Sequence, residues 1–136
     1  MPISPFHERT THENGMTFGL SPAGYDIRVA EKVWLMGGEF KLASTVERFT
    51  MPHDLIAQVC DKSSLARKGL AVQNTIIEPG WRGYLTLELT NHGWNTLQLE
   101  AGSPIAQIIF MRLEEATEQP YDGRYQDQPA GPQQAK

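Results

Sequence analysis

The chain has 136 residues, a formal net charge of −4 and a single cysteine. This length suits one domain with a sizeable core and is too short for two convincing ones. The acidic balance, without a basic stripe, argues against general nucleic-acid binding, and one cysteine excludes an intramolecular disulfide framework.

Residues 1–17 are polar and rich in His, Glu, Thr and Asn. They contain neither a long apolar stretch nor a basic leader, so we expect neither secretion nor a membrane span. Cys60 lies in an apolar run and is expected to be a buried core thiol, which suits a reducing compartment. These features together predict a cytoplasmic protein.

Short runs with a period of two dominate the rest of the chain and predict β-strands. The predicted strands cover residues 26–34, 55–60, 70–77, 84–90, 96–99 and 105–113. Between two of them, Glu78-Pro79-Gly80-Trp81 places Pro and Gly where a type II turn requires them. The pattern predicts an all-β barrel or sandwich as a single domain over residues 1–118. Residues 119–136 have little to bury and predict a flexible tail, ordered only against a ligand or a neighbouring subunit.

The segment 61–69 combines two hydroxyls, several cations and a closing glycine. It predicts a turn of helix with a serine at its N-terminus and Gly69 at its C-terminal end. Free backbone N–H groups, the hydroxyls of Ser63 and Ser64 and the charge of Lys62 or Arg67 would converge on phosphate oxygens there. From these residues alone, an ordinary capped surface turn is the alternative.

The predicted strand at residues 84–90 carries the first carboxylate of interest. Leucine occupies every second position, and Thr86, Glu88 and Thr90 occupy the positions between, so Glu88 projects opposite the apolar face. Periodicity alone favours a solvated glutamate on an exposed sheet face. Glu78 is the second carboxylate, and a turn-exposed acid beside Pro79 is its simplest interpretation.

Four histidines raise the question of a metal site: His7, His12, His53 and His92. Their spacing matches no standard metal site, so we expect no coordination by the protein. The zinc deaminase signature needs a Pro-Cys-x-x-Cys motif that one cysteine cannot supply, so the sequence excludes that class of zinc enzyme. Trp81 and Trp94 are expected to pack in the core or at a subunit interface.

Taken in order, these motifs resemble those of the dCTP deaminase and dUTPase superfamily. The matching segments are Ser63–Arg67, Glu78–Trp81, Leu87–Glu88 and Ile105–Phe110, with weaker matches at Pro5–Phe6, Gly24–Arg28, Tyr121 and Arg124–Gln128. The resemblance covers most of the chain and is closest to dCTP deaminases. It implies a distorted jelly-roll-like β-barrel of the dUTPase type, assembled as a homotrimer, with active sites at subunit boundaries and C-terminal tails closing over them.

The resemblance also implies roles for individual residues. Glu88 would take a proton from the water that attacks C4 of cytosine and pass it to the departing amine, Ser63 would help hold that water, and Arg67 would keep Glu88 ionised. Glu78 would contact the deoxyribose hydroxyl or, as the corresponding aspartate does in dUTPases, activate water against the α-phosphorus. The implied nucleotide-binding residues are Lys62, Ser64, Glu78, Thr86, Tyr121, Arg124 and Gln128.

The implied reaction is hydrolytic deamination of dCTP to dUTP and ammonia, with Mg²⁺ arriving on the triphosphate. A dUTP or dCTP pyrophosphatase, alone or coupled to deamination, and a non-catalytic nucleotide-sensing trimer are the alternatives. The expected partners are a deoxynucleoside triphosphate and further copies of the chain, without nucleic acid or membrane.

Two departures from the family pattern bear on specificity. The segment 69–78 is shorter than its usual counterpart, and the family recognises the pyrimidine there, so the choice between cytosine and uracil stays open. Lys62 stands where arginine is frequent, which preserves the charge and loses the bidentate fork for phosphate.

Overall fold

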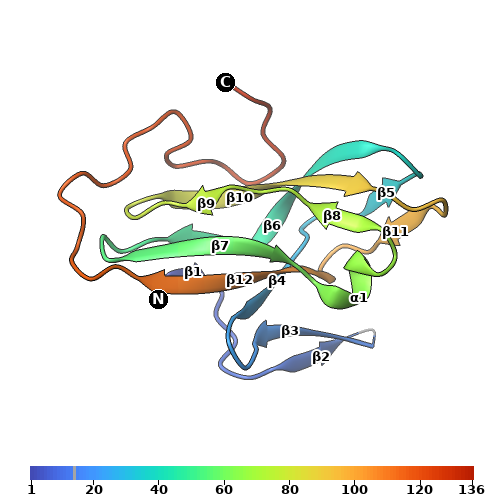
Figure 1. The fold of residues 1–136 in the computed structure, drawn as a ribbon, viewed down its shortest axis with the longest axis horizontal. Coiled ribbons are helices and arrows are strands. Elements are labelled where there is room, and N and C mark those ends of the chain that lie inside the picture. The colour runs from blue at the N-terminus through green and yellow to red at the C-terminus, as the bar shows by residue number, and fades with distance from the viewer. Residues whose placement is uncertain (14) are drawn as a thin grey trace.

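Antiparallel strands make up almost all of the regular structure (Figure 1). The computed structural model describes residues 1–13 and 15–136. One sheet has the order β1 (Ile3–Ser4), β6 (Phe40–Thr50), β10 (Arg82–Asn91), β8 (Leu70–Val72). The other has the order β2 (Thr11–Glu13), β3 (Met16–Leu20), β4 (Tyr25–Arg28), β12 (Pro104–Arg112), β7 (Leu55–Asp61), β9 (Ile76–Ile77). A separate pair joins β5 (Val33–Leu35) to β11 (Leu97–Leu99), and the helical turn α1 spans Ser63–Ala66.

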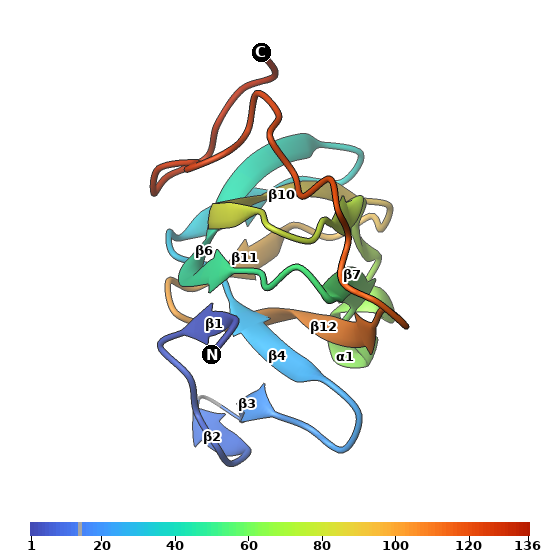
Figure 2. The ribbon, with the colours of Figure 1, turned by 90° about the vertical axis from the view of Figure 1, so that its left-hand side faces the viewer.

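The two larger sheets face each other, and the core lies between them (Figures 1 and 2). Side chains from both sheets are fully buried there, among them Ile27, Phe49, Leu87, Leu89 and Ile108. Burying such side chains contributes about 1.5–3 kcal/mol each to folding. The all-β prediction is confirmed, whereas the homotrimer stays a prediction because the structure contains one chain.

The longest strand, β6, was absent from the sequence prediction. Its burial pattern explains this, because Ser44, Thr45 and Glu47 are buried and interrupt the alternation of buried apolar and exposed polar residues. The fully buried Glu47 accepts hydrogen bonds from the Nε and the backbone N–H of Arg28, at 2.9 and 3.0 Å. A buried carboxylate of this kind is tolerated only when it is paired, and a partner 19 residues away is not visible in the strand pattern.

Two predicted strands are each divided in the structure. Residues 26–34 contain the end of β4 and the start of β5, and residues 70–77 contain β8 and β9. The second division positions the site, because β8 pairs with β10 in one sheet while β9 pairs with β7 in the other. Residues 73–75 therefore cross from one sheet to the other.

The turn before β10 has the predicted geometry. Gly80 has a φ of +83°, and the backbone N–H of Trp81 donates to the carbonyl of Glu78 at 3.2 Å, as expected for a type II turn. A Cβ at Gly80 would lie 2.6 Å from Cβ of Pro120, so the turn also allows the tail to approach. Trp81 is buried, which confirms its predicted packing role.

Trp94 is fully exposed in this chain, so it is not a core residue, and its packing at a subunit interface stays a prediction. One packing prediction is wrong. Cys60 on β7 is partly exposed instead of buried.

The C-terminal segment lies over the same chain. In Figure 2 it rises from the end of β12 along the outside of the sheets to a position above β10. Gln128 is buried, and its carbonyl accepts a hydrogen bond from the backbone N–H of Tyr84 at 3.0 Å. The tail thus has anchors within its own chain, and its flexibility stays a prediction.

Candidate active site

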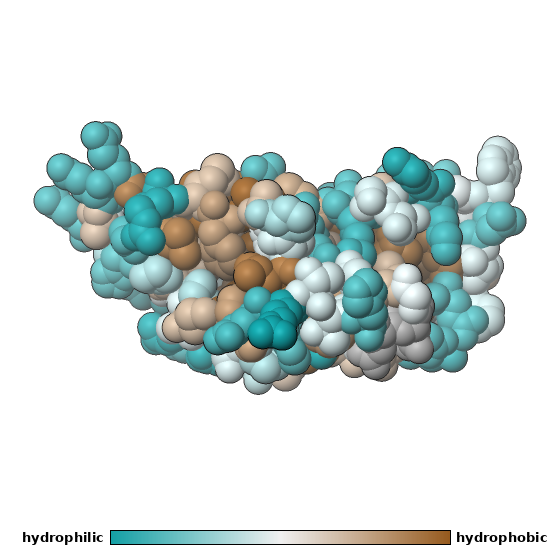
Figure 3. Space-filling view, turned by 90° about the horizontal axis from the view of Figure 1, so that it is seen from below, coloured by the Kyte–Doolittle hydropathy of each residue, from teal (hydrophilic) through white to brown (hydrophobic). Residues whose placement is uncertain are grey.

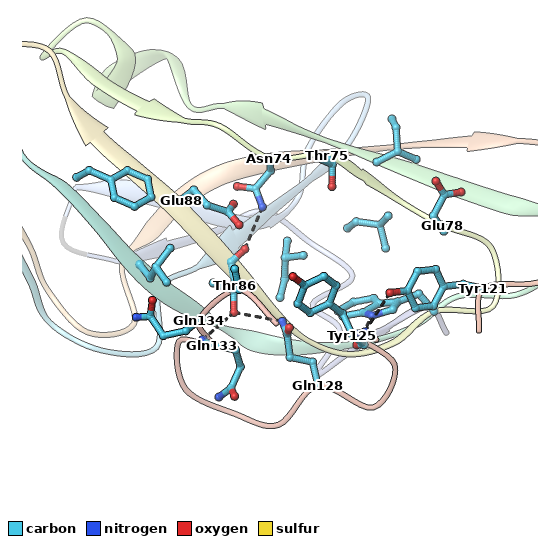
Figure 4. Close-up of a pocket in the computed structure, with 17 residues that line it drawn as sticks. Asn74, Thr75, Glu78, Thr86, Glu88, Tyr121, Tyr125, Gln128, Gln133 and Gln134 are labelled. Carbon is cyan, nitrogen blue, oxygen red and sulfur yellow. Dashed lines mark hydrogen bonds between the residues drawn. The ribbon is translucent and has the colours of Figure 1, made fainter. Parts of the chain in front are cut away.

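A cavity of about 780 Å³ lies between residues 74–78, the start of β6, the middle of β10 and the C-terminal tail (Figure 4). Its volume is in the range of small-molecule sites. A smaller hollow of about 340 Å³ is lined mainly by apolar groups such as Phe6, Leu20 and Phe110, and no carboxylate or cation is among its described lining residues. Figure 3 views the molecule from below and shows a hydrophobic area within a largely hydrophilic face. Of these two cavities, the larger one has carboxylates among its described lining residues, Glu78 and Glu88.

Glu88 enters this cavity from β10. A register irregularity between Tyr84 and Thr86 places Leu85, Thr86 and Glu88 along the cavity wall. The Glu88 side chain is half-buried, its Oε2 has no hydrogen-bond partner, and desolvation raises the pKa of its carboxyl. The solvated glutamate that periodicity favoured is therefore not observed.

Asn74 is a second polar residue of the cavity and was missed in the sequence analysis. It lies where the chain crosses between the sheets, and its Nδ2 donates to the backbone carbonyl of Thr86 at 3.0 Å. Its Oδ1 is buried without a partner. The available signal was the polar run Gln73-Asn74-Thr75 in the middle of a predicted strand.

The tail closes one side of the cavity. The hydroxyl oxygen of Thr86 accepts hydrogen bonds from Nε2 of Gln128 at 3.2 Å and from the backbone N–H of Gln133 at 3.1 Å. Nε2 of Gln128 also donates to the carbonyl of Tyr84 at 2.8 Å. These bonds join the predicted residues Thr86 and Gln128 directly.

Glu78 and Tyr121 line the other end of the cavity, where Glu78 is exposed. The backbone N–H of Tyr121 donates to the carbonyl of Pro79 at 2.8 Å. Nε1 of Trp81 donates to the carbonyl of Tyr125 at 2.8 Å. The Pro-Gly turn and the buried tryptophan thereby hold the two tail tyrosines at the cavity.

The other predicted site residues lie elsewhere in this chain. We call residues 62–67 the α1 region. Of the described residues that line the cavity, none comes from the α1 region, and Arg124 is not among them. Ser63, Ser64 and Arg67 are exposed on or beside α1. Nζ of Lys62 instead forms an ion pair with Oδ2 of Asp26 at 2.8 Å. Nη1 of Arg124 donates to the carbonyl of Lys136 at 2.6 Å.

The structure therefore brings five predicted residues together and leaves five apart. The residues at the cavity are Glu78, Thr86, Glu88, Tyr121 and Gln128. The residues outside it are Lys62, Ser63, Ser64, Arg67 and Arg124.

Across residues 1–13 and 15–136, no three His, Cys, Asp or Glu side chains are grouped to hold a metal ion. Within the same residues, no helix is long and apolar enough to cross a membrane.

Comparison with known proteins gives first the fold and then the family. Native EIAV dUTPase matches with a TM-score of 0.62 and 28% identity over 75% of this chain and 85% of that one. A dUTPase from phage phi11 of S. aureus, described with a coordinated structural Mg(II) ion, matches with a TM-score of 0.66 and 18% identity over 90% of this chain and 97% of that one. The jelly-roll-like barrel of the dUTPase type is thus confirmed.

Sequence comparison defines the family more narrowly. Residues 25–113 match the family described as dCTP deaminase-like. A dCTP deaminase of Pyrococcus horikoshii is 34% identical over 139 residues, which cover 91% of this chain and 83% of that protein. The chain belongs to the dCTP deaminase-like family.

Proposed function

We propose that the protein hydrolyses dCTP to dUTP and ammonia without zinc. The observation that carries this proposal is Glu88, a half-buried carboxylate with an unpartnered Oε2 in a cavity of about 780 Å³. An unpaired buried oxygen is costly, so a ligand or water that donates to it is expected there. Family membership supplies the reaction class, since the matched relatives are dCTP deaminases.

Glu88 acts in turn as base and acid. Its carboxylate takes a proton from water as the water oxygen bonds to C4 of cytosine, which gives a tetrahedral intermediate. It delivers that proton to N3, then takes the proton of the new C4 hydroxyl and passes it to the amino nitrogen; the C4–N bond breaks, ammonia leaves, and the C4 carbonyl of uracil forms. Desolvation raises the pKa of Glu88 and makes the protonated form easier to reach, as both roles require.

The triphosphate needs cations that the cavity lacks. Among its described lining residues there is no lysine or arginine, whereas Glu78 and Glu88 are both present. A polyanion would be repelled by such a site on its own. The exposed Ser63, Ser64 and Arg67 of a second copy supply the missing groups, with Ser63 holding the water, Arg67 beside Glu88 and Ser64 at the phosphates. Lys62 joins Ser64 at the phosphates when it leaves its ion pair with Asp26. This completes one site at each subunit boundary of a homotrimer.

The tail completes the closed site. Tyr121 and Gln128 already lie at the cavity, and Arg124, exposed on the same segment, turns toward the phosphates when the nucleotide binds. Mg²⁺ comes with the triphosphate, neutralises part of its charge and keeps most of its waters.

Pyrophosphate release is the second candidate function. Glu78 lies at the exposed end of the cavity, and the matched solved structures are dUTPases. In this reaction Glu78 takes a proton from the water that attacks the α-phosphorus. The bond between the α-phosphorus and its bridging oxygen breaks, and pyrophosphate leaves with the electron pair of that bond. The two reactions in sequence would convert dCTP to dUMP.

A time course with purified protein, Mg²⁺ and either dCTP or dUTP tests both candidates. We expect dUTP and ammonia from dCTP, without pyrophosphate. Formation of dUMP or dCMP with pyrophosphate would assign the catalytic role to Glu78. Nucleotide binding without any product would contradict both reactions and support a sensor.

A further inference from the structure

Two buried oxygen acceptors without partners line the same cavity: Asn74 Oδ1 and Glu88 Oε2. They come from different segments, since Asn74 lies in the sheet-crossing segment and Glu88 on β10. The backbone connects these segments, because the N–H of Gln73 donates to the carbonyl of Glu88 at 3.0 Å. In Figure 4 the side chains of Asn74 and Glu88 lie beside one another at the same end of the cavity.

The orientation of the Asn74 amide is fixed by its surroundings. Nδ2 donates to the carbonyl of Thr86 at 3.0 Å, and a flipped amide would set Oδ1 against that carbonyl oxygen. Thr86 is itself held by Gln128 and by the backbone of Gln133 through its hydroxyl oxygen. Asn74 therefore presents an acceptor, and not a donor, to the cavity.

We propose that Asn74 Oδ1 and Glu88 Oε2 together receive the exocyclic amino group of cytosine and so select dCTP against dUTP. This rests on the proposed function, which places the pyrimidine in this cavity. An exocyclic amino group has two N–H donors and can satisfy both oxygens. The side chain of Asn74 would thus be a specificity residue in the shortened segment between Gly69 and Glu78.

Uracil offers the opposite chemistry at the same position. Its O4 is an acceptor and would face two acceptors, leaving all three oxygens without donors. A site built to hydrogen-bond a substrate N–H discriminates strongly against an analogue that lacks it, because its own polar groups stay unpaired. A dCTP preference of roughly tenfold to a hundredfold from Asn74 is the expected size.

The test compares native protein with Asn74→Ala, and Gln73→Ala is the matched control. Gln73 is exposed and is not among the described cavity-lining residues. For each protein, ammonia release gives kcat/KM for dCTP, and competition gives the inhibition constant of dUTP. We expect Asn74→Ala to lower kcat/KM for dCTP by roughly tenfold or more while dUTP binds as well as before or more tightly. Gln73→Ala should retain both values.

If Asn74→Ala weakens the action on dCTP and the binding of dUTP equally, Asn74 only holds the Thr86 carbonyl in place, and the proposal is overturned. A preference for dCTP over dUTP that is the same in Asn74→Ala and in native protein would overturn it as well. Should Asn74→Ala not fold, Asn74→Gln keeps both an amide donor for the Thr86 carbonyl and an oxygen acceptor, and it must still prefer dCTP; loss of the preference contradicts the proposal.

The proposed function fails separately, if native protein releases no ammonia. Calorimetric titration of native protein and Asn74→Ala with dCTP and dUTP then decides the selectivity alone. Native protein that binds dUTP more tightly than dCTP would overturn the role of Asn74.

Discussion

The cavity beside β10 and the α1 region differ in the polar groups that they leave available. The cavity contains buried acceptors, Asn74 Oδ1 and Glu88 Oε2, and no cation among its described lining residues. The α1 region exposes hydroxyls and the charge of Arg67 to solvent. One region suits the amino group of a base and the other suits phosphate oxygens. We propose that each region supplies half of a nucleotide site, since the residues of the α1 region are not among the described residues that line the cavity of the same chain.

The largest expected effect comes from the cavity beside β10, which we call the acceptor half of the proposed site. Glu88→Gln removes the group that moves the proton, so ammonia release should fall by roughly 10²–10⁴-fold while nucleotide binding is largely retained. Glu115→Gln is the matched control, since Glu115 is exposed and is not among the described cavity-lining residues. Turnover by Glu88→Gln close to that of the control would remove Glu88 from the mechanism.

A smaller effect is expected from the α1 region, which we call the cationic half of the proposed site. Arg67→Ala should lower kcat/KM for dCTP by about 10²-fold, because a charge-assisted contact is lost. Lys68→Ala, which removes a neighbouring exposed cation, should have little effect on steady-state kinetics. Equal losses for both variants would indicate general electrostatic attraction instead of a specific contact.

The tail should contribute less again. Gln128→Ala removes the donor to the Tyr84 carbonyl and the Thr86 hydroxyl oxygen, which weakens the attachment of the tail by about 1–3 kcal/mol. We expect kcat/KM to fall about tenfold and limited proteolysis to cut the tail faster. Gln119→Ala, at an exposed position, serves as the control. An unchanged proteolysis rate would contradict this anchoring role.

The smallest effect concerns stability. Because the folded-state pKa of Glu88 is raised, its favourable contribution is complete below the unfolded pKa of about 4.3 and is lost as pH rises through the folded value. Gln at position 88 does not ionise, so the Tm of Glu88→Gln relative to native protein should increase as pH rises. Thermal unfolding from pH 4 to pH 8 checks this. A Tm difference independent of pH would contradict the raised pKa.

The sequence was sufficient for the fold class because most strands have apolar alternation and clear turn signals. It was insufficient for β6, where Ser44, Thr45 and Glu47 are buried. Each has hydrogen bonds to distant groups, such as Arg28 for Glu47, Glu31 for Ser44 and the Leu85 carbonyl for Thr45. Periodicity cannot distinguish buried polar residues that have distant partners from exposed polar residues.

The site divides in the same way. Glu88, Glu78 and Gln128 could be predicted because they belong to recognisable motifs, and the cavity contains all three. Asn74 was not predicted, because its place at the cavity depends on the crossing between sheets that divides residues 70–77. The ion pair of Lys62 with Asp26, 36 residues away, likewise depends on tertiary packing.

Mixing two inactive variants tests most directly whether the acceptor half and the cationic half come from different copies. Glu88→Gln and Arg67→Ala are unfolded together, refolded at equal amounts and assayed for ammonia release from dCTP. Random assembly into trimers with shared sites restores about a quarter of native activity, because that fraction of sites receives both intact halves. Activity that stays at the level of the separate variants would contradict a site shared between chains.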